Sequence, residues 1–196
     1  MILRINGLPS LLNLNLQGND LCVGVQVLFE GLGRGAAPSL RILNLRQNQI
    51  GSDGAEALSA AILRGAMPKL ERLHISSNPL GNQGVAALAP GLRSLQSLEV
   101  LQLWKTETGD EGVASLVSNL GENEMRALEE LDLDYNKVTD KGCVTLVTAI
   151  KADLLPGLKY VPLGGVSQDL VCNPATEAAI GAVQHALFQA HVDSYR

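Results

Sequence analysis

The feature of this 196-residue chain that most constrains its fold is a leucine pattern that returns every 28 to 30 residues. Each copy follows L-x-x-L-x-L-x-x-N-x-L or a close variant, as in LRILNLRQNQI from Leu40 to Ile50. A period of this length indicates stacked structural units, because one unit cannot bury its own apolar face. The copies begin at six leucines: Leu11, Leu40, Leu70, Leu98, Leu128 and Leu158.

Each unit combines two apolar spacings. Leu43 and Leu45 alternate with polar residues, which predicts a short strand with one buried face. Leu58 and Ile62 lie four residues apart, which predicts a helix that covers the other side of the unit. Residues of N-cap type precede these helices and are expected to cap their first turns: Ser52, Asn82, Asp110 and Asp140. Two residues later comes a glycine that leaves room for the helix to approach the strand layer: Gly54, Gly84, Gly112 and Gly142.

An asparagine follows four of the expected strands. A buried asparagine can bond backbone N–H and C=O groups at once, so these side chains should form a ladder between units. In the fourth unit Thr106 takes this place, and fewer side-chain hydrogen bonds are expected there. The ladder residues are Asn19, Asn48, Asn78 and Asn136.

On these blocks the chain resembles leucine-rich repeats of the ribonuclease-inhibitor type, over about residues 8–163. Such units also occur in the Ran GTPase-activating protein and in nucleotide-binding innate-immune receptors. The resemblance implies an α/β solenoid, a right-handed horseshoe with parallel strands on the concave face and helices on the convex face. We therefore expect residues 1–196 to form a single leucine-rich repeat domain of about six repeats.

The two ends of such a stack need caps. The last block lacks the asparagine at its ninth position, so Asn173 and Pro174 are interpreted as the N-cap and first helical position of a closing helix, about residues 174–192. Its expected apolar stripe is Ile180, Val183, Leu187 and Phe188. At the other end, Leu3 and Ile5 could form one short covering strand. Otherwise the N-terminal edge belongs to a longer solenoid or is covered by a neighbouring molecule.

Composition argues against several classes of function. Fifteen basic and twenty acidic residues give a net charge of −5, which argues against a nucleic-acid partner. No run of about 18 apolar residues exists, so no membrane insertion is expected. The cysteines, Cys22, Cys143 and Cys172, have no metal-ligand spacing and are expected to be buried and reduced, which favours the cytoplasm. We expect no metal and no cofactor.

The outward side chains of the strands form the expected functional surface. Trp104 is the sole tryptophan and lies at an outward position, beside charged residues and a tyrosine. Exposed aromatic residues among charges are typical of protein-binding hot spots. The alternative is that Trp104 folds over Lys105 or Tyr135 and only shields the sheet. The predicted partner-binding residues are Arg46, His74, Trp104, Lys105, Asp132, Asp134 and Tyr135.

The leading hypothesis is a non-catalytic module that binds a partner protein on its concave sheet. No catalytic residue is expected, because Gln102 separates His74 from Asp132 in the stack and no nucleophile accompanies them. One alternative is a GTPase-activating regulator resembling the Ran GTPase-activating protein, although no catalytic residue of that family can be matched here. Others are an architectural subunit packed at its N-terminal edge, and the sensing end of an immune receptor. The last would need a longer chain, since no P-loop sequence is present.

Overall fold

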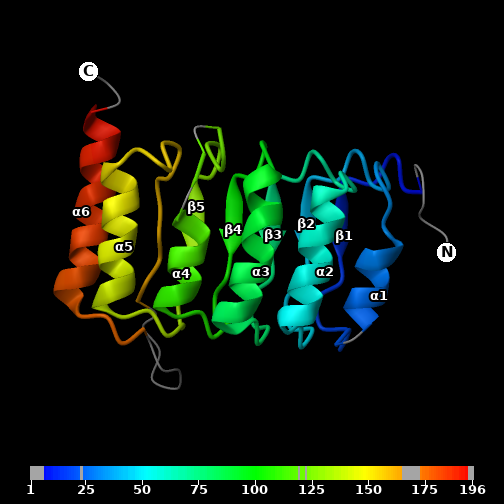
Figure 1. Ribbon diagram of the computed structural model, residues 1–196, viewed down its shortest axis with the longest axis horizontal. Coiled ribbons are helices and arrows are strands. Elements are labelled where there is room, and N and C mark those ends of the chain that lie inside the picture. Colours follow the sequence, from blue (N-terminus) through cyan, green and yellow to red (C-terminus); the bar gives the residue numbers. More distant parts are fainter. Residues whose placement is uncertain (1–6, 23, 119, 122, 165–172, 194–196) are drawn as a thin grey trace.

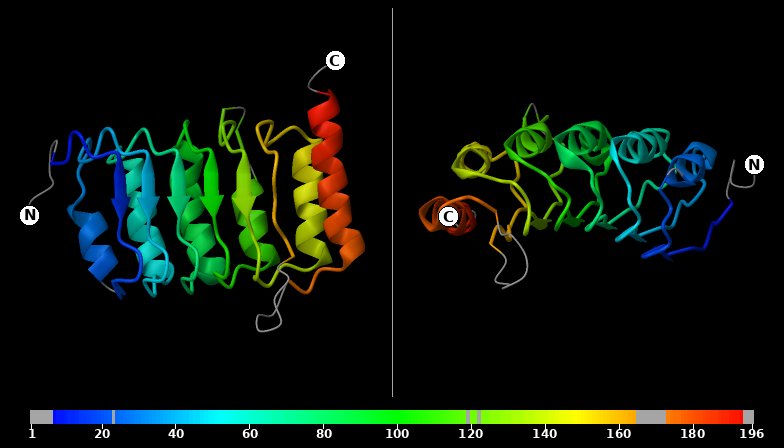
Figure 2. Two further views of the ribbon diagram at one scale, coloured as in Figure 1. Left: turned by 180° about the vertical axis from the view of Figure 1, so that it is seen from behind. Right: turned by 90° about the horizontal axis from the view of Figure 1, so that it is seen from below.

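The computed structural model describes residues 7–22, 24–118, 120–121, 123–164 and 173–193. Five short parallel strands form one open sheet in the order β1-β2-β3-β4-β5, and helices stack along one side of it (Figure 1). Seen end-on to the strands, the molecule is a shallow arc with helices on the outer, convex side and strands on the inner, concave side (Figure 2). The predicted α/β solenoid, with parallel strands on the concave face and helices on the convex face, is confirmed.

Strands and helices alternate from β1 to α5, and α6 then follows α5. The strands are β1 (Asn13–Asn15), β2 (Ile42–Asn44), β3 (Arg72–His74), β4 (Val100–Gln102) and β5 (Glu130–Asp132). The helices are α1 (Gly24–Gly31), α2 (Ser52–Leu63), α3 (Gly81–Ser94), α4 (Asp110–Val117), α5 (Asp140–Lys151) and α6 (Glu177–Asp193).

The core lies between the sheet and the helix layer, and its strand side consists of two leucine-rich rows. In the first row, residues of neighbouring strands pair in register and all but the first are at most 1% exposed: Leu14, Leu43, Leu73, Leu101 and Leu131. The second row is fully buried: Leu45, Ile75, Leu103 and Leu133. The helices contribute a facing row, at most 1% exposed: Leu58, Leu88, Leu116 and Leu146. The repeat therefore buries apolar area only by stacking.

A sixth rung extends the sheet beyond β5. Tyr160 forms an isolated parallel bridge with Glu130. The N–H of Leu131 donates to the Tyr160 carbonyl at 3.0 Å, and the N–H of Leu133 donates to the Pro162 carbonyl at 3.0 Å. The block that begins at Leu158 thus continues the stack with the same hydrogen-bonding pattern.

The asparagine ladder forms as expected. The Oδ1 atom of buried Asn78 accepts the N–H groups of Asn48 and Ile50 at 2.9 and 3.0 Å. Its Nδ2 atom donates to the carbonyls of Leu45 and Ile75 at 2.9 and 2.7 Å. Asn48, Asn78 and Asn136 each join two units in this way, since the amide bonds backbone groups of its own unit and of the preceding one.

Thr106 weakens the ladder at the fourth unit. Its hydroxyl lies 2.7 Å from the Leu103 carbonyl and 2.8 Å from the Thr108 hydroxyl, within its own unit. On the preceding unit, the N–H of Leu80 donates instead to the Asn78 carbonyl at 2.8 Å. A hydroxyl cannot replace both ends of an amide, so the backbone here turns differently.

The interpretation of Asn173 as a helix cap is wrong. Its Oδ1 atom accepts the N–H of Val138 at 2.9 Å, and its Nδ2 atom donates to the carbonyls of Leu133 and Leu163 at 2.8 Å. Asn173 is therefore the ladder asparagine of the sixth unit, and α6 begins only at Glu177. The sequence concealed this because Asn173 follows its strand leucine by ten residues, against three in the fifth unit.

Most of the expected stripe on α6 is buried. Val183 and Leu187 are 0% and 5% exposed, and Ile180 packs against the core. Phe188 is 63% exposed, contrary to expectation, while Ala186 is buried. The reason is that α6 packs on α5 from one side (Figure 2), and the exposure of Phe188 places it off that side.

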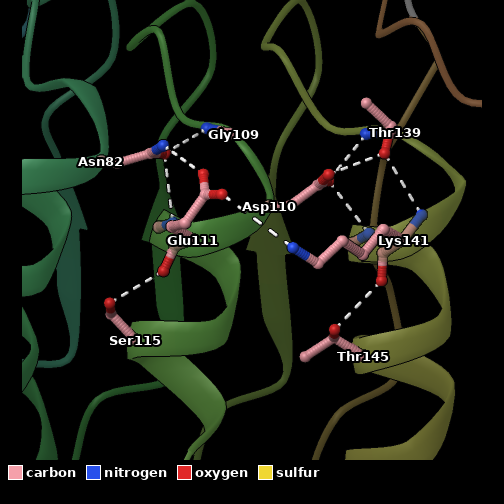
Figure 3. A network of polar contacts seen from close by, with 10 residues as sticks. Asn82, Gly109, Asp110, Glu111, Ser115, Thr139, Lys141 and Thr145 are labelled. Carbon is pink, nitrogen blue, oxygen red and sulfur yellow. Dashed lines mark hydrogen bonds and ion pairs between the residues drawn. The ribbon is translucent and has the colours of Figure 1, made fainter.

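The polar residues expected to cap their own helices do not do so. The N-cap positions of α2, α4 and α5 are Gly51, Gly109 and Thr139, and only Thr139 accepts a bond from its own helix. The expected caps lie one or two residues inside the helices instead. Three of them, Asn82, Asp110 and Asp140, reach forward to the next unit, and Figure 3 shows the first two.

These contacts repeat from unit to unit: a side chain at the start of one helix accepts N–H groups near the start of the next helix. Asn82 Oδ1 accepts the N–H groups of Gly109 and Gly112 at 2.6 and 3.1 Å. Asp110 Oδ1 accepts from Thr139 and Gly142, both at 2.9 Å, and Asp140 Oδ1 accepts from Thr176 at 2.7 Å. A side chain of the preceding unit thus accepts N–H groups at the starts of α4 and α5, and Thr139 and Thr176 add local caps on α5 and α6.

The recurring glycines allow neighbouring units to stack closely. A Cβ on Gly142 would lie 2.6 Å from Asp110 Oδ1, and one on Gly54 would lie 2.6 Å from Val25 Cγ1. Asp110 and Val25 belong to the preceding helices α4 and α1. The glycines therefore let neighbouring helix starts approach, and the expected approach of helix to strand layer is not their main role.

The cysteines fulfil their prediction in part. Cys143 is buried, and desolvation, followed by the charges of Asp140 and Asp110, raises its pKa to about 11. Cys22 is exposed, so its predicted burial is wrong, because it follows the first strand at the open end of the stack. Cys172, Leu3 and Ile5 lie outside the described residues.

The N-terminal end of the described core is incompletely covered. Leu14, Leu16 and Leu28 are half-buried, whereas the corresponding residues of the second unit are fully buried. Together with Phe29 and other apolar side chains, they line an apolar hollow of about 300 Å³. Among the described residues, apolar surface therefore remains uncovered at this end of the stack.

Candidate protein-binding surface

A polar hollow of about 430 Å³ lies on the concave sheet, just beyond the ends of the strands. Its lining residues come from units one to five, because outward side chains at equivalent positions of neighbouring strands lie next to one another. Its lining residues are Gln17, Arg46, Gln47, Ser76, Ser77, Trp104, Asp132 and Asp134.

The structure brings the predicted binding residues into one region. Arg46, Trp104, Asp132 and Asp134 line the hollow. His74 lies beside it on β3, where it pairs with Gln102 of β4. The other two lie next to Trp104: exposed Lys105 and half-buried Tyr135.

Trp104 is half-buried and rests against Tyr135 of the next unit. The ring centroids are 5.6 Å apart and the planes cross at 81°, an edge-to-face arrangement. Trp104 therefore packs against Tyr135 and also lines the hollow. A preorganised aromatic side chain of this kind loses little conformational entropy on binding.

Arg46 reaches across the sheet from the second unit. Its Nη2 atom donates to Gln102 Oε1, and Gln102 Nε2 donates to Glu130 Oε1 at 3.1 Å. This chain links units two, four and five beneath the hollow. The buried Nε atom of Arg46 has no hydrogen-bond partner among the described residues, so its charge is only partly satisfied.

The fifth unit presents three carboxylates on the concave face: Glu130, Asp132 and Asp134. Desolvation raises the pKa of Asp132 to about 6, and the charges of Asp134 and Glu130 add to this, while the Asp134 N–H and Arg46 oppose it. Desolvation also raises the pKa of Asp134, and a hydrogen bond from the Gly164 N–H opposes this rise. The Oδ1 atom of Asp134 is buried without a hydrogen-bond partner among the described residues. We call these three residues the acidic column.

The acidic column includes a residue that the sequence reasoning missed. Glu130 was not selected, and neither were the polar residues Gln17, Gln47, Ser76 and Ser77 that line the hollow. Strand alternation could have found Glu130, because it lies two residues before Asp132 and faces the same way.

His74 has a lowered pKa, caused first by burial and then by the charges of Arg46 and Arg72. It is therefore neutral at pH 7 and adds no positive charge to the surface. Within the described ranges, no three His, Cys, Asp or Glu side chains gather closely enough to hold a metal ion. In the same ranges, no helix has the length and apolar character needed to cross a membrane.

The sequence and the fold were compared with known proteins. Three segments, residues 36–59, 66–89 and 125–147, match the family model described as Leucine Rich repeat. A similar solved structure is the tropomodulin C-terminal domain from Caenorhabditis elegans, with 16% sequence identity and a TM-score of 0.53. The match covers 95% of this chain and 87% of that chain, and it speaks for the fold alone. No curated protein matches the sequence.

Proposed function

We propose that this leucine-rich repeat solenoid is a non-catalytic protein-binding module that holds a segment of a partner protein on its concave sheet. The observation that carries the proposal is the hollow around Trp104, which joins an anchored aromatic ring to partly unsatisfied charged groups. Buried aromatic anchors surrounded by polar groups dominate the energy of many protein interfaces.

We also assign the repeats to the ribonuclease-inhibitor type, on the grounds of their length of 28 to 30 residues and their helical convex side. A cytoplasmic location accompanies this proposal. The exposed free thiol of Cys22 is compatible with a reducing compartment.

The test is affinity capture with the full chain, followed by mass spectrometry and a binding titration with the captured protein. Trp104→Ala should weaken that complex by at least about 2 kcal/mol, because truncation of a hot-spot aromatic residue has this effect. Phe188→Ala is the matched control, since Phe188 is an aromatic side chain exposed on α6, away from the hollow. Equal affinity of the wild type and Trp104→Ala would refute the proposal.

A second candidate function is that of an architectural subunit with a neighbour on its N-terminal end. The open apolar hollow beside Leu14, Leu16 and Leu28 favours it. The mass of the purified chain in dilute solution distinguishes a free monomer from a self-associated form. A single-turnover GTPase assay with a Ran-type protein tests the GTPase-activating alternative, for which we expect no acceleration.

A further inference from the structure

We infer that the hollow accepts one basic side chain of the bound segment, an arginine or a lysine, between Trp104 and the carboxylates of Asp132 and Asp134. The inference rests on the proposed function and specifies its partner chemistry. It follows from the placement of charged residues on the sheet and from the Asp134 oxygen that has no hydrogen-bond donor among the described residues. It also follows from the Trp104 ring, which lines the hollow.

The acidic column makes no ion pair among the described residues, although the charge of Arg46 opposes the rise in the pKa of Asp132. The ion pairs among the described residues involve other carboxylates: Arg41 pairs with Glu71, Lys137 with Glu107, Lys141 with Glu111 and Lys159 with Glu129. By contrast, the column receives hydrogen bonds from uncharged groups. Glu130 accepts from the Gln102 amide, and Asp132 Oδ1 accepts from the Asp134 N–H at 3.0 Å.

The carboxylates also bear a desolvation cost. Asp134 Oδ1 has lost contact with water without gaining a donor among the described residues. The raised pKa of Asp132 has the same origin, burial combined with repulsion from Asp134 and Glu130. A cation entering the hollow would offset both effects, whereas an apolar or acidic side chain would increase them.

Trp104 adds a reason for an organic cation. It lines the same hollow as Asp132 and Asp134, and its contact with Tyr135 holds its ring in place. Aromatic rings attract guanidinium and ammonium groups, and carboxylates bind guanidinium groups through paired hydrogen bonds. A metal ion is disfavoured, because the described carboxylates do not gather into a group of metal ligands.

The electrostatic pattern also orients the partner. Arg72 lies on unit three, the Arg46 guanidinium reaches Gln102 of unit four, and the acidic column lies on unit five. A segment that crosses the strands therefore fits best with its basic residue over unit five and an acidic residue toward units three and four.

The test uses N-acetyl-L-arginine methylamide as the probe and the citrulline analogue as its uncharged isostere. Because Trp104 is the sole tryptophan, its fluorescence and its indole N–H resonance report on the hollow directly. The arginine probe should shift both signals and bind at least about fivefold more tightly than the citrulline probe. Equal binding of the two probes would overturn the inference.

The double variant Asp132→Asn/Asp134→Asn keeps the shape of the hollow and removes two charges. It should lose the preference for arginine, whereas Glu56→Gln, an exposed carboxylate change on α2, should keep it. An unchanged preference in the double variant would overturn the inference. So would a response of Trp104 to calcium chloride at lower concentration than to the arginine probe, because that result would indicate a metal site.

The captured partner separates this inference from the proposed function. If Trp104→Ala weakens the partner complex and the double variant does not, the basic-residue inference fails and the protein-binding function stands. If the arginine probe binds as expected while Trp104→Ala leaves the partner complex unchanged, the proposed function fails.

Discussion

The carboxylate of Asp110, on α4, caps the start of α5 by accepting the Gly142 N–H at 2.9 Å. The same oxygen accepts the Thr139 N–H, and Thr139 also donates its hydroxyl to Asp110 Oδ2 at 2.7 Å. Desolvation opposes ionisation of Asp110, but these hydrogen bonds and the Lys141 charge lower its pKa overall. One side chain thus joins two consecutive units.

Replacing this cap should destabilise the protein. We expect Asp110→Ala to lower the free energy of unfolding by about 1 to 2 kcal/mol, because it removes the acceptor of two N–H groups at a helix start. Urea unfolding at pH 7 measures the change. Asp53→Ala is the control, since Asp53 is an exposed carboxylate in the first turn of α2, and its loss should cost at most about 0.5 kcal/mol.

Acid should remove the contribution of Asp110. Because its folded-state pKa is depressed, the contribution is complete above the unfolded value of 3.8 and is lost as the pH falls through the folded value. The unfolding curves of wild type and Asp110→Ala should therefore approach each other below about pH 4. A constant difference down to pH 2 would contradict the role of the carboxylate charge.

The ladder asparagines should differ in importance according to their place in the stack. Asn78→Ala should cost about 3 kcal/mol or more, because it leaves the buried N–H groups of Asn48 and Ile50 without an acceptor. Asn19→Ala should cost about 1 kcal/mol, since exposed Asn19 donates only to Leu16 and Gln17 of its own unit. Chemical denaturation of both variants tests this, and equal losses would contradict a ladder between units.

Two helical glycines should respond in opposite directions to alanine. A Cβ on Gly91 would lie 2.8 Å from Ser59 Cα on α2, where backbone cannot move aside cheaply. Gly91→Ala should therefore destabilise the protein by about 1 to 3 kcal/mol. Gly181, on α6, has open space around it, so Gly181→Ala should stabilise by about 0.5 to 1 kcal/mol. Thermal melting of the two variants gives the signs, and a shift in the same direction would contradict the close packing of α2 and α3.

Asp132 should reduce stability at neutral pH. Its folded-state pKa of about 6 exceeds the unfolded value of 3.8, so ionisation above pH 6 disfavours the folded state. After allowance for its partial exposure, Asp132→Asn should raise the free energy of unfolding at pH 7.5 by up to about 1 kcal/mol. Asn15 and Asn44 occupy the same position of their units and make the same turn hydrogen bond, so the amide should keep it.

The pH dependence checks this last prediction. The advantage of Asp132→Asn should shrink as the pH falls from 6 to 4, because the wild-type carboxyl then takes up its proton. An advantage that is absent at pH 7.5, or unchanged at pH 4, would contradict it. If Asp132→Asn stabilises the protein and also weakens partner binding, a carboxylate that binding requires lowers the stability of the folded protein.

The leucine rows could be predicted because strand and helix periods act within each unit. Leu43, Leu58 and their counterparts are buried wherever a neighbouring unit covers them. The sixth ladder residue could not be found, because an insertion moves Asn173 away from its expected position. Trp104 and Asp134 were recognised as outward residues, but the contact of Trp104 with Tyr135 and the unpartnered oxygen of Asp134 depend on distances between units.

By itself, the sequence determined the period, the alternation of strand and helix, and the face on which the strand side chains lie, since these follow from local geometry and apolar spacing. Only the tertiary structure decided that Asp110 caps the following helix rather than its own, and that Arg46 reaches Gln102 two units away. The physical reason is that stacking brings together residues about thirty or sixty positions apart. Which of them meet depends on how closely neighbouring units pack, and no local pattern carries that information.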